Sequence, residues 1–163
     1  MLANQIGHYS LILGLIFSLI LSVISIKDFK GSGRKINQNV FILSFLQLTF
    51  VIVSFLSLIF SFIKSNFVNE TVFNNSHTTK PLFYKISGTW GNHEGSLLLW
   101  LLVLTLFIFL FLIKSGQQPK KYRILTLLFQ QIIIIGFFLF VLITSNPFNY
   151  LFPIPNEGLG LNP

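Results

Sequence analysis

The stretch GTWGNHEGSLLLW carries the side chains of this chain that are best suited to chemistry. Trp90, His93, Glu94 and Trp100 lie close together, and a long apolar run follows them directly. At about 100° per helical residue, Trp90, His93, Leu97 and Trp100 would share one stripe. An aromatic stripe beside a histidine can hold a flat apolar ligand such as haem, with the imidazole as a ligand or a hydrogen-bonding group.

A second interpretation of the same residues needs no ligand. Tryptophans often anchor a helix at the membrane surface, and the histidine and glutamate would then be solvated among the lipid headgroups. A single histidine does not specify a metal site, so spacing alone leaves both interpretations open. Asn92 is expected to cap the following helix, with Glu94 in its first turn, where the helix dipole favours a carboxylate. Gly91 and Gly95 remove bulk, so another group could approach the backbone closely there.

Lipid must surround most of the elements that position this stretch. Of the 163 residues, 53% are hydrophobic and 9% are charged, whereas a soluble domain carries about 25% charged residues. Four apolar runs are long enough to cross a bilayer as helices, which takes about 20 residues each. They cover residues 9–26, 40–63, 92–113 and 124–143. Because the runs lack the alternation of a β-barrel, the sequence predicts an all-α integral membrane protein, a single polytopic unit over residues 1–163.

The basic residues predict the orientation of these four spans. Lysine and arginine are concentrated in the short links 27–39 and 114–123. By the positive-inside rule these links face the cytoplasm or matrix, and the loop 64–91 and the Pro-rich tail 144–163 face the outer side, together with both termini. The net charge of +7 therefore reports topology, and no nucleic-acid partner is expected. The first span has no basic n-region before it, so it is expected to be retained rather than cleaved as a signal peptide.

Three further features bear on packing and chemistry. Gln47 in the second span and Gln130 and Gln131 in the fourth are expected to face protein, because an unpaired amide in lipid is costly; they could contact each other. The Asn-rich segment 64–80 is expected to be a mobile surface loop, and its two glycosylation sequons, at Asn69 and Asn74, are interpreted as chance. The chain has no cysteine, which excludes disulfides and thiolate chemistry of its own.

The segment TWGNHEGSLLLW closely resembles the motif WG-x-HEGS-LLLW of the CcmF family, the membrane haem-handling component of cytochrome c maturation. The tail supports the match, because SNPF at 145–148 and then FPIPNEGLGLNP resemble a later stretch of that family. The resemblance covers roughly residues 85 to 163, and the first two spans match by topology only.

This resemblance implies an N-terminal portion of a CcmF-like protein, either a split mitochondrial subunit or a truncated form. It implies haem as the cofactor of the complete assembly, although the tryptophan-rich haem-binding domain of the family has no counterpart here. It also implies the remaining CcmF portion, thiol-handling lyase subunits, a haem chaperone and apocytochrome c as partners, in a mitochondrial or bacterial inner membrane. Trp90, His93, Glu94 and Trp100 are then expected to form a surface beside the haem.

A rival function from another class is a small hydrophobic structural subunit of a respiratory complex, or a transporter fragment. A self-contained pump or transporter is disfavoured, because the cores of the four apolar runs hold no ionisable side chain.

Overall fold

The computed structural model describes residues 2–31, 33 and 36–160, and it is helical. The four long helices are α1 (Leu2–Lys30), α2 (Gln38–Ile63), α5 (His93–Lys114) and α6 (Lys120–Ile143). Two short helices, α3 (Glu70–Asn75) and α4 (Leu82–Gly88), lie between α2 and α5. Among the described residues the only β-type pairing is an isolated bridge between Asn69 and Tyr150.

All four long helices are long and apolar enough to cross a membrane, with mean hydropathies of 2.4 to 3.0 over their most apolar windows. The prediction of an all-α fold with four candidate spans is therefore confirmed. The first helix is longer than its apolar run, which was expected to begin at residue 9. Hydropathy detects only the part of a helix that prefers lipid, whereas the first turns of α1 hold polar side chains such as Asn4, which is fully buried against other protein groups.

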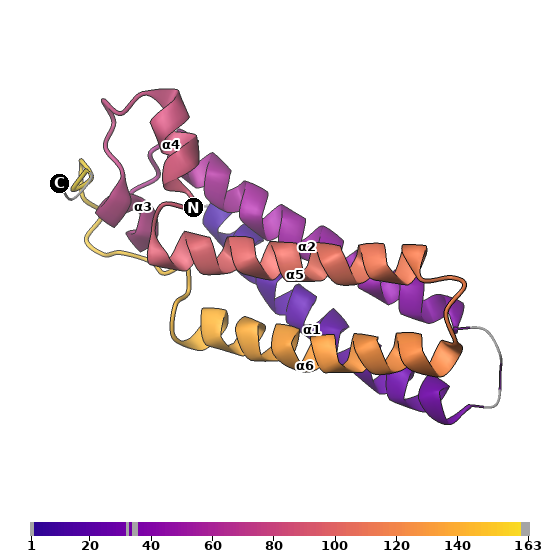
Figure 1. Cartoon of the computed structure of the whole chain (residues 1–163). Helices are drawn as coiled ribbons and strands as arrows, with labels where there is room; N and C mark the ends of the chain where they lie inside the picture. Colours follow the sequence, from indigo (N-terminus) through magenta and orange to yellow (C-terminus); the bar gives the residue numbers. More distant parts are fainter. Residues whose placement is uncertain (1, 32, 34–35, 161–163) are drawn as a thin grey trace.

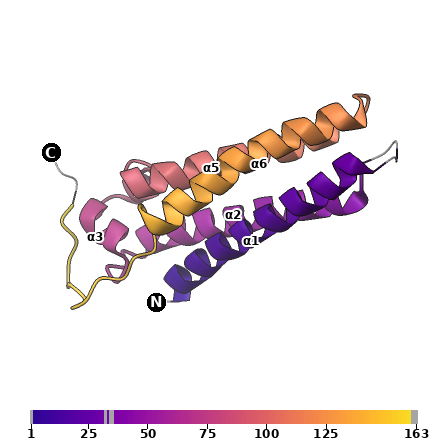
Figure 2. The same cartoon turned by 90° about the horizontal axis from the view of Figure 1, so that it is seen from below.

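The four long helices form a closed ring in which each packs against two neighbours. α1 packs on α2 and α6, and α5 packs on α2 and α6. Figure 2 shows the resulting two layers, with α5 and α6 lying over α1 and α2. In Figure 1 the end of α1, the start of α2 and the link α5–α6 lie at one end of the bundle, which we call the basic end. The start of α1, the helices α3 and α4, and the tail after α6 lie at the other end, which we call the loop end.

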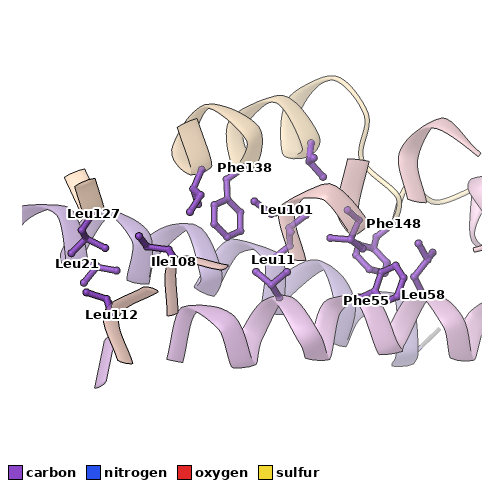
Figure 3. Packing of buried hydrophobic residues seen from close by; sticks show 14 of the residues in the cluster. Leu11, Leu21, Phe55, Leu58, Leu101, Ile108, Leu112, Leu127, Phe138 and Phe148 are labelled. Atoms are coloured by element: carbon purple, nitrogen blue, oxygen red, sulfur yellow. The ribbon is translucent and has the colours of Figure 1, made fainter. Parts of the chain in front are cut away.

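Aliphatic and aromatic side chains fill the space between the two layers. Figure 3 shows Leu21, Ile108, Leu112 and Leu127 gathered in one part of the core. Phe138, Leu101, Leu11 and then Phe148 continue this core along the bundle. Phe148 belongs to the tail rather than to a helix, so the tail contributes directly to the core.

A polar contact interrupts this core near the middle of the bundle. The side-chain amides of Gln47 and Gln131 bond to each other in both directions, at 3.4 Å and 3.2 Å, and both residues are fully buried. Ser18 Oγ donates to Gln131 Oε1 at 2.6 Å. The expectation that the glutamines of the second and fourth spans meet is thus confirmed for Gln131. Gln130 is only partly buried, because adjacent helical residues point about 100° apart.

Charged groups tie the two links together at the basic end. Lys120 Nζ lies 2.7 Å from Asp28 Oδ1, and the backbone amide of Asn37 donates to Asp28 Oδ2 at 2.9 Å. Arg123 is buried and donates through Nε to Ser115 Oγ and through Nη2 to the Leu112 carbonyl. The guanidinium therefore bonds to groups at the C-terminal end of α5, where cations are favoured.

Candidate functional site

The start of α5 is fixed by groups within the motif itself. Asn92 is the N-cap residue, and its side chain accepts a hydrogen bond from the Gly95 amide at 2.7 Å, as the sequence predicts. A Cβ added at Gly95 would lie 1.6 Å from the Thr89 carbonyl oxygen, so only glycine fits there. The close approach expected at Gly95 is therefore made by the chain's own backbone, and this position offers no room for a ligand. Glu94 lies in the first turn of α5, as predicted.

The four candidate residues lie on two different elements. Trp90 lies in the turn after α4, with 42% of its surface exposed. His93 is the first residue of α5, and Trp100 lies two turns further along, with 60% of its surface exposed. The expectation of one helical stripe from Trp90 to Trp100 was wrong, because α5 begins only at His93. Leu97 and Trp100 do share a helix face with His93, at spacings of four and seven residues.

A hydrogen bond joins the two motifs that carried the family resemblance. His93 Nε2 lies 3.1 Å from Ser145 Oγ, the first residue of the SNPF stretch after α6. The next residue of that stretch, Asn146, donates through its side chain to His8 Nδ1 of α1 at 3.3 Å. Segments more than 50 residues apart in the chain thus meet at the loop end, where His93 holds the start of the tail.

Buried amides at the loop end form a cluster that the sequence did not reveal. Asn4 and Asn69 are fully buried and bond to each other through their side chains. Asn4 also donates to the Phe148 carbonyl at 2.9 Å, and Asn69 donates to the Pro147 carbonyl at 2.8 Å. Asn69 Oδ1 accepts from the Val72 amide, so the same side chain caps α3. We call Asn4, Asn69 and these two tail carbonyls the amide clamp.

The amide clamp corrects the expectation of a mobile loop over residues 64–80. Phe67, Val68 and Val72 are buried there, and the tail runs beside this segment, since the Leu151 amide donates to the Val68 carbonyl at 2.9 Å. The Asn69 sequon is buried inside the protein, in agreement with its interpretation as a chance match. The only signal in the sequence was the pattern Asn69-x-x-Val72, in which an asparagine can cap a short helix.

Further along, the tail is held by a carboxylate. Glu157 accepts hydrogen bonds from the Thr78 hydroxyl at 2.5 Å and from the Thr78 amide at 2.9 Å. These two bonds, the hydroxyl first, hold the pKa of the Glu157 carboxyl below its ordinary value. His77 Nε2 lies 3.7 Å from the same carboxylate. The segment 64–80 and the tail are thus joined twice, by the amide clamp at Asn69 and by the bonds between Thr78 and Glu157.

Among the four candidate residues, His93 has the one side chain of a type that commonly ligates haem iron. In the part of the chain that the structure describes, no three side chains of the histidine, cysteine, aspartate or glutamate types come together to hold a metal ion. His93 Nε2 lies within hydrogen-bonding distance of Ser145 Oγ. Trp90 and Trp100 are exposed, and His93 and Glu94 lie between them in the sequence, in the first turn of α5.

Comparison with known proteins gives consistent matches. No protein-family model matches the chain. The chain is 41% identical over 162 residues to the cytochrome c-type biogenesis protein CycK of Rhizobium meliloti. It is 34% identical over 160 residues to CcmF of Haemophilus influenzae and 35% identical over 160 residues to CcmF of Escherichia coli. Each match covers 98% of the chain but only 24% to 25% of the relative's length.

A solved structure agrees with the fold. The chain of the cytochrome c haem lyase CcmF superposes with a TM-score of 0.77 at 23% identity, over 90% of this chain and 25% of that one. The four-helix arrangement therefore occurs as part of a longer chain. The match extends beyond the residues that carried the resemblance, because it includes the first two spans.

Proposed function

Because the chain belongs to the CcmF family of cytochrome c-type biogenesis proteins, we propose that it acts as part of a CcmF-like haem lyase component. In this role it supplies a membrane scaffold and, at the loop end, a surface for the attachment of haem to apocytochrome c. The observation that carries this proposal is the similarity over 98% of the chain to CycK and CcmF. The chain spans about a quarter of the length of these relatives.

The proposal places the basic end in the cytoplasm or matrix and the loop end on the outer side of a bacterial or mitochondrial inner membrane. The lysines and arginines of the two short links support this orientation through the positive-inside rule. Since the chain has no cysteine, single cysteines can be introduced without a background. A membrane-impermeant maleimide should label Asn74→Cys in intact cells or mitoplasts and Gln117→Cys only after permeabilisation. The reverse pattern would overturn the orientation.

The candidate surface consists of Trp90, His93, Glu94 and Trp100. The two indoles offer exposed flat apolar area, which suits a porphyrin or an aromatic side chain of a partner. The carboxylate and imidazole at the start of α5 add polar groups at the same end of the bundle. When bound in the complete assembly, haem would supply the vinyl groups that react with thiols. This chain contributes no thiol, so the reacting cysteines come from apocytochrome c.

The partners follow from this division of roles. The remaining CcmF portion would hold the haem, a haem chaperone would deliver it, and thiol-handling lyase subunits would keep the apocytochrome reduced. The helices expose apolar side chains on the surfaces that face away from the bundle core, including Phe107, Phe129 and Ile132. Lipid or the remaining CcmF portion would cover them.

Haem-stained cytochrome c in cells that depend on this chain tests the surface. We expect a double substitution, Trp90→Ala and Trp100→Ala, to lower the amount of mature cytochrome several-fold while the membrane level of the chain is unchanged. The matched control is Phe83→Ala, because Phe83 is an exposed aromatic side chain of α4 at the same end. Equal maturation in the double variant and the control would remove the proposed surface.

A second pair of variants separates two roles of His93. If His93 only holds the tail, Ser145→Ala should impair maturation as much as His93→Ala, because both remove the same hydrogen bond. If His93 also contacts the haem or its carrier, His93→Ala should impair maturation more than Ser145→Ala does. Normal maturation in both variants would show that neither role matters.

A further inference from the structure

A groove on the outside of the bundle runs between the first turns of α1 and the last turns of α2. One half has a volume of about 440 Å³ and is lined almost entirely by apolar side chains, including Ile6, Leu56 and Phe60. The other half, of about 480 Å³, contains Lys64 and Ser65. The two halves share Phe60 and two residues of α1, so they form one continuous groove.

The chemistry of the groove changes along its length. Leu56 and Phe60 are 55% and 52% exposed at the apolar half, on helices that are long and apolar enough to lie in hydrocarbon. At the other half the Lys64 ammonium lies over the Phe60 ring, 5.8 Å from its centroid. Lys85 Nζ donates to Ser65 Oγ at 2.7 Å, which places a second cation beside the groove wall. No carboxylate is among the described residues that line either half.

We propose that this groove binds an anionic phospholipid. α2 ends at Ile63, so Lys64 lies at the depth where a transmembrane helix meets the lipid headgroups. A phosphate there would be attracted by Lys64 and, more weakly, by Lys85. An acyl chain would extend from it over Phe60 towards Leu56. A cation at one end and hydrocarbon contacts at the other match the two parts of a lipid. The proposal depends neither on the function in haem attachment nor on which side of the membrane the loop end faces.

Lipid retention by the purified chain tests this proposal. The chain is extracted from bilayers with equal amounts of phosphatidylglycerol and phosphatidylcholine of identical acyl chains, and the retained lipids are counted by native mass spectrometry. We expect the wild type to retain phosphatidylglycerol preferentially. Lys64→Gln should lower this preference about fivefold, since one lysine near the surface contributes about that factor. Lys114→Gln is the matched control, because Lys114 also ends a long helix but lies at the basic end, and it should lower the preference less, since it removes no cation from the groove.

A second pair of variants tests the acyl half without changing charge. Leu56→Trp should fill the apolar half and lower the retention of both lipids. Leu19→Trp places the same ring on an exposed position of α1 outside the groove and should have no such effect. Equal retention of the two lipids by the wild type, or equal losses in Lys64→Gln and Lys114→Gln, would overturn the proposal. The same two variants are then compared in the protein assembled with its partners. If Leu56→Trp and Leu19→Trp retain equal amounts of lipid there, a helix of another polypeptide occupies the groove and the proposal fails.

Discussion

The glutamine contact in the centre of the bundle leads to a quantitative prediction. Gln131→Leu removes both bonds to Gln47 and the bond from Ser18, and it leaves the Gln47 amide buried without a partner. Gln47→Leu removes only the two mutual bonds, and Gln131 keeps its bond from Ser18. An interhelical side-chain hydrogen bond in a membrane protein contributes about 0.6 kcal/mol on average.

The expected losses in unfolding free energy follow from these contacts. Gln131→Leu should destabilise the bundle by about 2 kcal/mol and Gln47→Leu by about 1 kcal/mol. The double variant should lose about 1 kcal/mol less than the sum of the single losses, because the two mutual bonds can be lost only once. Unfolding of the chain in mixed micelles with increasing SDS, followed by circular dichroism, measures all three values.

Gln130→Leu is the matched control for this cycle. Gln130 neighbours Gln131 on α6 but is only partly buried, and the structure gives its side chain no hydrogen-bond partner among the described residues. Its substitution should change the unfolding free energy by less than about 0.5 kcal/mol. Additive losses from Gln47→Leu and Gln131→Leu would refute the reasoning, because they would mean that the two amides do not interact in the membrane.

Three further predictions concern packing and the loop end. Gly7→Ala should destabilise the bundle by about 1–3 kcal/mol in the same SDS titration, because its Cβ would lie 2.2 Å from the Phe148 ring. Gly136→Ala is the control: its Cβ meets no atom within 4 Å, so this substitution should be neutral or slightly stabilising. Asn69→Ala should lose about 2–3 kcal/mol, because it removes the α3 cap and two bonds of the amide clamp; an unchanged SDS midpoint would contradict this. Since hydrogen bonds lower the pKa of Glu157 in the folded state, its contribution is fully present above the ordinary glutamate pKa and is lost as the pH falls through the lowered value. The protection factors of the tail amides, which compare deuterium exchange with the intrinsic rate at each pH, should therefore fall in acid, and Glu157→Gln should remove that fall.

Much of the helical scaffold could be predicted because its determinants are local. Apolar runs locate the four long helices. Asn92 indicates the start of α5, because an asparagine side chain can cap the first turn of a helix. The meeting of Gln47 and Gln131 was also predictable, because lipid offers an amide no partner and each glutamine lies within an apolar run. These inferences need only the sequence of one segment and the nature of the solvent around it.

The loop end could not be predicted, because its contacts join segments that are distant in the sequence. Asn4 and Phe148 are 144 residues apart, and nothing near either residue indicates the other. Asn69 lies among other asparagines, so composition alone suggested a solvated loop, whereas the fold buries it. Trp90 was assigned to a helical stripe by extending the periodicity past the Asn92 cap, whereas α5 begins at His93 and the Thr89 carbonyl packs against Gly95.

The glutamine pair and the amide clamp impose an order on biosynthesis. α1 and α2 emerge from the ribosome long before α6 and the tail, yet Gln47 finds its partner only in α6, and Asn4 can donate to the Phe148 carbonyl only after the tail is made. A newly inserted α1–α2 hairpin therefore carries two amides without their final hydrogen bonds, and it depends on water, on the insertion machinery or on temporary contacts until α6 arrives. Nascent chains stalled before residue 131 should accordingly be less stable in the bilayer and more readily degraded than those that have passed residue 150.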